Sequence, residues 1–270
     1  MQTEEKIKEK AFVERVIEIA KMAGSFIARE AVGFKQDKVE EKKGYSDLVS
    51  YVDKEAEKML VTALNKLLPE AGFLAEEGTG GEVQGDWLWV IDPLDGTTNF
   101  IHGLPVYAVS IALLHQGQAR LGVVYEINKS ECFSAVEGMG AFLNGRPIAV
   151  SQTDALEGTL LATGFPYYDF ARMDEYMPIL RAFMETTRGL RRLGSAAVDL
   201  AYVACGRFDG YFEYNLNAWD VAAGVLIVKE AGGSVTDLKG GDDYIFGREV
   251  LAAGAIHPEM LRVITDHWDR

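Results

Sequence analysis

The sequence is poor in cysteine, in long apolar runs and in basic residues relative to acidic ones. Its 270 residues contain two cysteines, Cys132 and Cys205, without CxxC spacing. We therefore expect no disulfide framework, and a reducing cytoplasm suits the chain better than secretion. The opening MQTEEKIKEK is charged throughout, and no later apolar run is long enough to cross a bilayer. These absences predict a cytoplasmic protein without a membrane partner.

The chain carries 27 basic and 41 acidic residues, for a formal net charge of -14. This charge repels nucleic-acid backbones, so no nucleic-acid partner is expected. It would also repel a phosphate ester, unless some acidic residues gather around cations that invert the local field. The other proportions, 48% hydrophobic and 25% charged residues, are those of an ordinary globular protein.

Apolar spacing predicts a helix from about residue 4 to 30. Ser50 and Asp53 form an S-x-x-D capping signal that predicts a second helix, closed by Pro69 and Gly72. Strands are expected at 72–75 and 87–91, and residues 106–137 are expected to form a meander of longer strands around a turn at Gln116. The glycine-rich residues 138–148 are expected to be a turn-laden connection. This first part, residues 1–150, is predicted to be an α+β half that carries the metal-binding loops.

The second half, residues 151–270, alternates helical and strand signals. Helices are expected near 173–187, 195–205 and 218–231, and strands at 209–213 and 250–254. The fold class is therefore α/β, with two halves that share one compact layered sandwich. The second half would supply substrate-facing residues and Asp220.

Residues 89–100, WVIDPLDGTTNF, place two aspartates directly after an apolar stretch. Asp92 and Asp95 lie three residues apart, so their carboxylates can converge on one ion or bridge two. Mg²⁺ prefers oxygen ligands in octahedral geometry and is usually shared between carboxylates and a substrate phosphate. The backbone N–H groups of Gly96 and Thr97 can then receive a phosphate. The segment is a candidate site for both.

Each acidic residue also has an ordinary structural interpretation. The Asp-Pro-x-Asp-Gly sequence favours a turn, Asp47 could cap a helix or a turn, and Glu76 with Glu77 could form a solvated acidic turn. Asp220 stands at the third helical position behind Asn217, where an acidic side chain is often a capping partner. These interpretations are separate for each residue, whereas one metal site would account for all of them together.

Five segments, in this order, resemble the motif set of the inositol monophosphatase family: DLVSYVD, AEEG, DPLDGTTNF, GSAA and WDVAAG. The resemblance runs from about residue 40 to 232 and covers most of the chain. It implies an αβαβα sandwich like that of fructose bisphosphatase. It also implies a homodimeric, magnesium-dependent and lithium-sensitive phosphatase of small phosphate esters. No metal-binding or phosphate-binding motif position departs from the family pattern.

The resemblance further implies a role for each acidic residue. Glu76, Asp92 and the carbonyl oxygen of Leu94 would hold one Mg²⁺, while Asp92, Asp95 and Asp220 would hold a second. A third, loosely bound ion would rest on Glu76 and water, so that two or three ions share the site.

By the same resemblance, the backbone of Gly96 and Thr97 would cradle the phosphate, and Asp47 would be hydrogen-bonded to the Thr97 hydroxyl. Cations in the site would offset charge on the phosphoryl oxygens and ease the deprotonation of water at neutral pH. The catalytic group would be Glu76 with the Asp47–Thr97 pair, which orient and help deprotonate the attacking water. In-line attack of this kind needs no covalent intermediate. The alcohol part of the substrate would be faced by Asp95, Asp220, Gly194, Ala196 and Glu213.

Glu213 favours myo-inositol monophosphate as the substrate, because a carboxylate can accept hydrogen bonds from ring hydroxyls. Fructose-1,6-bisphosphate, histidinol phosphate and a nucleotide phosphate are alternatives, since one metal site serves all of them. Arg191 and Arg192 could receive a second phosphate, or lie in surface salt bridges or a subunit interface. A regulatory binding protein with the same fold and little catalysis is the alternative from a different class. The intact acidic set argues against it.

Overall fold

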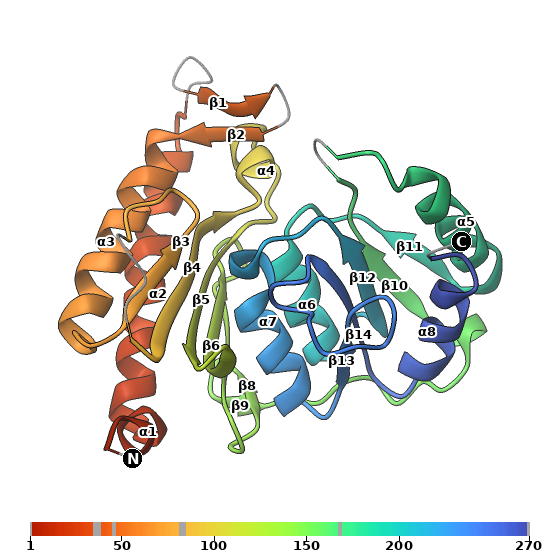
Figure 1. Ribbon diagram of the computed structural model, residues 1–270. Coiled ribbons are helices and arrows are strands. Elements are labelled where there is room, and N and C mark those ends of the chain that lie inside the picture. Colours follow the sequence, from red (N-terminus) through yellow and green to blue (C-terminus); the bar gives the residue numbers. More distant parts are fainter. Residues whose placement is uncertain (1, 35–38, 45–46, 81–84, 167–168, 269–270) are drawn as a thin grey trace.

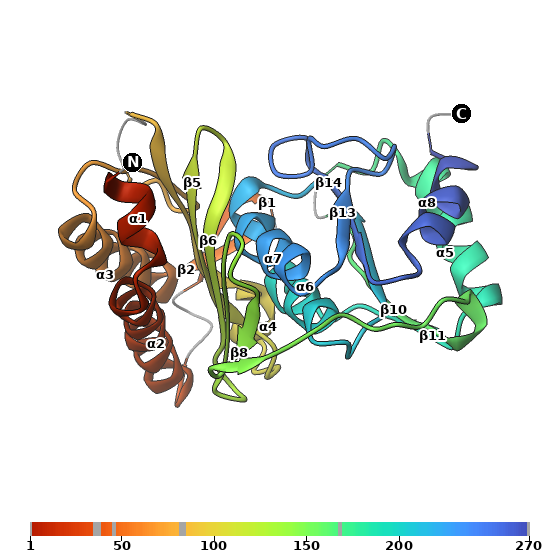
Figure 2. The same cartoon turned by 90° about the horizontal axis from the view of Figure 1, so that it is seen from below.

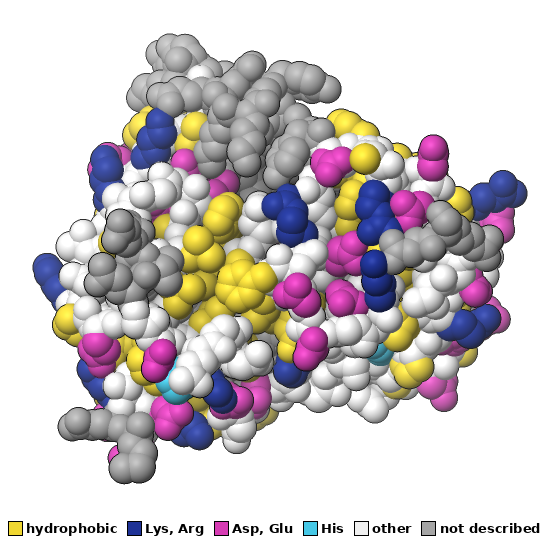
Figure 3. All heavy atoms as spheres, in the orientation of Figure 1, with side chains coloured by type: hydrophobic (Ala, Val, Ile, Leu, Met, Phe, Trp, Pro, Cys, Tyr) yellow, Lys and Arg dark blue, Asp and Glu magenta, His cyan; other side chains and the backbone are white. Residues whose placement is uncertain are grey.

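The computed structural model describes residues 2–34, 39–44, 47–80, 85–166 and 169–268. Its layers alternate between helix and sheet along one direction (Figure 1), and the view from below separates them (Figure 2). Charged side chains of both signs are interspersed on the face shown in Figure 3. The αβαβα arrangement is the predicted fold class.

The first layer contains α1 (Gln2–Lys8), α2 (Lys10–Ala31) and α3 (Tyr51–Leu67). The helix predicted near 4–30 is therefore two helices, with Glu9 as the N-cap of the second. The capping signal at Ser50 is confirmed, because its side chain accepts from Val52 N at 3.1 Å and its backbone N–H donates to Asp53 at 2.9 Å. Within the described ranges, no helix combines the length and apolar character that a bilayer crossing needs.

The second layer is a seven-stranded sheet whose strands follow chain order. The predicted meander is confirmed by its central strands, and residues 138–148 hold two further short strands in place of a purely turn-laden connection. They form because Asn144 and Gly145, both at positive φ, make a tight hairpin turn. The sheet consists of β3 (Gly72–Ala75), β4 (Trp87–Asp95), β5 (Ala108–His115), β6 (Gln118–Glu126), β7 (Glu131–Val136), β8 (Ala141–Leu143) and β9 (Arg146–Pro147).

The fourth layer is a five-stranded sheet in the order β11-β10-β12-β14-β13. Its strands are β10 (Leu160–Thr163), β11 (Gly189–Arg191), β12 (Gly210–Tyr214), β13 (Ser234–Thr236) and β14 (Glu249–Ala253). The outer layer on this side contains α5 (Met173–Thr186) and α8 (His257–Thr265). A separate pair, β1 (Val39–Gly44) and β2 (Asp47–Ser50), leads into α3.

The third layer consists of α6 (Ala196–Ala204) and α7 (Ala218–Glu230), which lie between the two sheets. Both helices are apolar over most of their circumference, as expected for helices buried on all sides. Gly122 of β6 permits a close approach, because a Cβ there would lie 2.7 Å from the Ala223 carbonyl oxygen. The start of α6 meets the end of β4, where the Ala197 backbone N–H donates to Asp95.

Candidate metal centre

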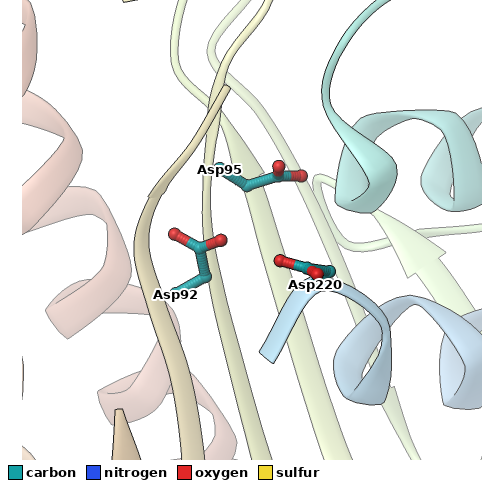
Figure 4. A group of neighbouring side chains, drawn as sticks. All are labelled: Asp92, Asp95 and Asp220. Atoms are coloured by element: carbon teal, nitrogen blue, oxygen red, sulfur yellow. The ribbon is translucent and has the colours of Figure 1, made fainter. Parts of the chain in front are cut away.

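Three aspartates converge between the first sheet and the central helices. Asp92 and Asp95 extend from β4, Asp220 extends from the first turn of α7, and their carboxylates point toward one another (Figure 4). One oxygen from each lies within 4.8 Å of the others. These are the distances at which carboxylates can share cations.

A bulge in β4 lets both of its aspartates face the same side. Residues three apart on a regular strand point to opposite faces of the sheet. Here Asp92 pairs with Ser110 and Asp95 with Ala108, so that three steps on β4 match two on β5. The extra residue restores the shared direction, and the proposed metal geometry therefore depends on this irregularity.

Asp220 is both a helix cap and a member of the acidic cluster. Its carboxylate accepts a hydrogen bond of 2.6 Å from the Asn217 backbone N–H in a capping box. The start of α7 is also held to β5, because the Ser110 hydroxyl donates to the Trp219 carbonyl oxygen at 3.2 Å. The predicted capping role is confirmed, and it positions the carboxylate rather than excluding it from a metal site.

Glu76 follows β3 at the same end of the sheet as Asp92. Strands β3 and β4 run parallel with Ala75 beside Ile91, and the Glu76 backbone N–H donates to the Ile91 carbonyl oxygen at 3.3 Å. The half-buried Glu76 side chain is close enough for its charge to raise the pKa of all three aspartates, in addition to the effect of burial. A fourth carboxylate thus borders the cluster.

The electrostatics of the cluster favour a cation. Asp92 is 2% exposed, and its pKa is raised well above the ordinary value by burial and then by the charges of Glu76, Asp95 and Asp220. Burial, followed by the charge of Asp95, also raises the pKa of Asp220. Mutual repulsion in a buried place disfavours ionisation unless a positive charge offsets it. Since every donor is an oxygen, the residues fit a hard divalent cation such as Mg²⁺.

Asp95 is oriented by the N-terminus of α6. One of its oxygens accepts from the Ser195 hydroxyl at 2.7 Å and from the Ala197 backbone N–H at 2.6 Å. Burial raises the pKa of Asp95 to about 6, although these two hydrogen bonds lower it. Ser195, which the sequence had not indicated as a site residue, is also the N-cap of α6.

The turn after β4 presents the predicted phosphate-binding residues. Gly96 has a φ of 97°, and a Cβ there would lie 2.9 Å from the Val106 carbonyl oxygen, so this position requires glycine. The Leu94 backbone N–H donates to Asp92 at 2.9 Å, and the Leu94 carbonyl oxygen accepts from the Thr97 hydroxyl at 3.0 Å. Thr97 begins the short helix α4 (Thr97–Ile101), whose first N–H groups have no partner within the helix.

The Thr97 hydroxyl donates to Asp53 at 2.8 Å, a contact that the sequence analysis did not predict. The Asp47 side chain lies outside the described residues, and its backbone belongs to β2, three residues before the Ser50 cap. Asp53 is fully buried in the first turn of α3, where it faces Thr97. The motif DLVSYVD has an aspartate at each end; the structure shows the second one in contact with Thr97, and the contact of Asp47 stays a prediction.

A second acid on α3, Glu57, was also missed by the sequence interpretation. It is fully buried and accepts hydrogen bonds from Glu77 N at 2.6 Å, from Thr79 N at 2.8 Å and from the Thr79 hydroxyl. These bonds fix the loop that follows Glu76. Asp53 and Glu57 stand one helical turn apart on the face that buries Val52, Ala56 and Leu60. Acidic residues at buried helix positions were the signal that could have identified both.

The side of the site predicted to face the alcohol is assembled from three further segments. Asn99 of α4 donates from Nδ2 to the carbonyl oxygens of Leu193 and Val106, each at 2.8 Å, and so holds the loop before α6. Gly194 has a φ of 88° in this loop, and Ala196 is the first residue of α6.

Glu213 lies in β12, outside the group of three aspartates but close to it. It is 9% exposed and accepts from the Tyr211 hydroxyl at 2.5 Å. A Cβ at Gly164 would lie 1.9 Å from a Glu213 carboxylate oxygen. The Glu213 carboxylate therefore occupies the place that a side chain at position 164 would need. Burial raises the pKa of Glu213 to about 7, with opposing effects from the Tyr211 hydrogen bond and the Arg192 charge.

A layered α/β sandwich with an all-oxygen acidic site defines a class of proteins that act through bound cations. The chain belongs to the inositol monophosphatase family, whose model matches residues 9–269. It is 45% identical to the Nus factor SuhB of Pseudomonas aeruginosa, over 86% of this chain and 88% of that protein. It is 42% identical to an inositol-1-monophosphatase of Mesorhizobium japonicum, over 91% and 92% respectively.

A solved structure shares the fold. The extragenic suppressor protein suhB of Bartonella henselae superimposes with a TM-score of 0.87 at 42% identity, over 94% of this chain and 98% of that one. The family and the named relatives together indicate a phosphatase.

The stability of the metal-free protein should fall as pH rises from about 4 to about 7. The native pKa of about 6 for Asp95 and of about 7 for Glu213 exceed the ordinary values of 3.8 and 4.5. Between these values the native state binds more protons than the unfolded chain, so the stability present at low pH is lost as both groups ionise. Thermal unfolding in EDTA across this range measures the effect. An equally steep fall in the Asp95→Asn/Glu213→Gln double variant would contradict it.

Proposed function

We propose that the chain hydrolyses a small phosphomonoester with the help of Mg²⁺, and that myo-inositol monophosphate is the best candidate substrate. The observation that carries the proposal is the convergence of Asp92, Asp95 and Asp220 within 4.8 Å. Glu76, Asp92 and the Leu94 carbonyl oxygen are the ligands we assign to a first ion. Asp92, Asp95 and Asp220 are those we assign to a second, and a third would rest on Glu76.

The residues around the ions have distinct tasks in this proposal. Bound cations would offset the charge of the phosphoryl group and lower the pKa of water. The N–H groups of Gly96 and Thr97, at the start of α4, bind the phosphate oxygens. Glu76 and the Thr97 hydroxyl orient the attacking water, and Asp53 holds that hydroxyl through the 2.8 Å hydrogen bond. In this proposal Asp53 has the role that the family resemblance assigns to Asp47.

The alcohol part of the substrate lies toward the start of α6 and β12. Gly194 and Ala196 would face the ring of the substrate, and the Glu213 carboxylate would accept hydrogen bonds from its hydroxyls. Asp95 and Asp220 border the leaving oxygen, where a proton must arrive as the bond breaks. This arrangement favours a polyol over a planar leaving group.

Two alternatives remain, one for the substrate and one for the class of protein. Fructose-1,6-bisphosphate, histidinol phosphate or a nucleotide phosphate would use the same ions, and Arg191 and Arg192 are the residues proposed to receive a second phosphate. The Arg192 guanidinium lies 5.9 Å from the centre of the Phe165 ring, and its charge acts on Glu213. A regulatory protein is the alternative from another class, motivated by the relative named Nus factor SuhB. We further propose a cytoplasmic homodimer, from the scarcity of cysteine and the family resemblance.

Phosphate release from myo-inositol monophosphate should depend on Mg²⁺, because the clustered carboxylates would otherwise repel the phosphate dianion. We expect chelation to abolish release and Mg²⁺ to restore it, and Li⁺ and Ca²⁺ to inhibit. Asp95→Asn should remove turnover while the circular dichroism spectrum stays unchanged. Full turnover after exhaustive chelation would exclude the metal mechanism, and the absence of release from every phosphomonoester tested would favour the regulatory alternative.

Asp53→Asn should lower kcat by about 100-fold, because the Thr97 hydroxyl loses its charged acceptor. Asp47→Asn should leave kcat near the wild-type value. Ser50→Ala is the matched control, since it removes the other half of the capping box at a cost of about 1 kcal/mol while Thr97 keeps its partner. Steady-state kinetics with urea unfolding separate the two effects. A larger loss of kcat in Asp47→Asn than in Asp53→Asn would restore the original assignment.

Glu213→Gln should lower kcat/KM for myo-inositol monophosphate by roughly 10- to 100-fold, because hydroxyls lose a charged acceptor. The same variant should spare p-nitrophenyl phosphate, whose leaving group has no such hydroxyls. Parallel kinetics on the two substrates provide the measurement. Equal losses would instead assign Glu213 to metal or structural support, and no loss on either substrate would remove it from the site.

A further inference from the structure

A groove runs along the outer surface of α2 and α3, on the side of these helices away from the active site. Arg15 and Met22 of α2 line one wall, residues 58–67 of α3 supply the other, and the groove encloses about 670 Å³. The opposite faces of both helices are buried against the sheet through residues such as Val16 and Leu60. The groove is therefore the part of this helix layer that does not face the sheet.

The groove has an apolar floor. Met59, Ala63 and Leu67 stand four residues apart on α3, so they form one row about 12 Å long. Met22, which is 43% exposed, faces this row from α2. Methionine side chains adapt to different partners, and an exposed apolar row at helical spacing suits the side chains of a docked helix.

The walls of the groove are cationic. Lys58 and Lys66 form a second row with Thr62 along α3, and Arg15 lies across the groove on α2. None of the described residues that line the groove is acidic, although the whole chain has a net charge of -14 and the face shown in Figure 3 mixes both signs. The described lining thus carries three cations, which contrasts with the net charge of the whole chain.

Two of these cations make ion pairs in which a carboxylate of a partner could replace the present acid. Arg15 bonds Glu18 at 2.8 Å and Lys58 bonds Glu55 at 2.7 Å, each within its own helix. In both pairs each side chain is more than half exposed, so the pairs are weak and a docked carboxylate can replace either acid.

We propose that this groove binds an acidic amphipathic helix of a partner protein. Apolar residues at every third or fourth position would pack on the row from Met59 to Leu67, and flanking glutamates or aspartates would pair with Arg15, Lys58 and Lys66. The charge selects the occupant, because a basic or neutral helix would gain nothing from the walls. The groove is remote from Asp92, so occupancy and phosphate release are separable.

The probe is a fluorescein-labelled synthetic helix of about five turns, with leucines along one face and glutamates beside them. A second peptide carries lysine in place of every glutamate. Fluorescence anisotropy with the full-length protein should show binding of the acidic peptide, weakened by salt, and none of the basic one. Equal binding of the two peptides, or none of the acidic one, would overturn the proposal.

Two variants locate the binding site. Lys58→Glu/Lys66→Glu should weaken binding of the acidic peptide at least about tenfold, because it reverses one wall of the groove. Ala63→Trp fills the floor without changing the charge and should also weaken binding. The matched control is Arg181→Glu/Arg188→Glu, which changes net charge equally on the opposite side of the molecule and should bind as the wild type does. Equal loss in this control would mean non-specific attraction and would overturn the proposal.

The wild-type protein and the same variants also test two other occupants of the groove. Self-association that sedimentation detects in the wild type and that is lost only in the groove variants would assign the groove to a second copy. Binding to phosphatidylglycerol vesicles that is lost in the same way would assign it to a lipid surface. Either result overturns the proposal. Phosphate release and the unfolding midpoint should stay unchanged in all variants, so failure here leaves the proposed phosphatase function standing.

Discussion

The repulsion among carboxylates that the fold holds together is the constraint on which the candidate site depends. Asp92, Asp95 and Asp220 lie within 4.8 Å in a place where burial already opposes their ionisation. Such a cluster persists because rigid elements impose it: the end of a central strand and the first turn of a buried helix. A cation relieves the repulsion, and a phosphate can then approach a region that would otherwise exclude it. The strongly acidic composition and an anionic substrate are thus compatible.

Most of the hydrogen bonds that position the site residues join a carboxylate to the start of a helix or to a loop. Asp95 accepts from the first turn of α6, and Asp220 accepts from the backbone N–H of the α7 N-cap, Asn217. From the outer layer, Asp53 and Glu57 reach the Thr97 hydroxyl and the loop after Glu76. Each of these acids is therefore fixed by hydrogen bonds that it would need in any case once buried. Structural stability and site geometry depend on the same bonds.

Much of this arrangement could be predicted from the sequence because its signals are local. Helix periodicity, the S-x-x-D cap and the cap before Asp220 each depend on residues within a few positions of one another. The hairpin at Asn144 was overlooked despite its turn signal. The contact of Thr97 with Asp53 could not be predicted from the sequence, because it depends on the orientation of α3. The contribution of Asn99 likewise depends on a contact with a residue 94 positions away.

The bulge between Asp92 and Asp95 has a consequence for how this region can change over evolution. Side chains near it can be exchanged while the backbone path is kept, as long as the carboxylates remain. A change of length is different, because loss of the extra residue would turn one carboxylate to the other face of the sheet. The spacing between these two positions should therefore resist insertion and deletion more strongly than the identities of the residues between them resist substitution. Sequence length, rather than chemistry, is the stricter requirement at this point of the chain.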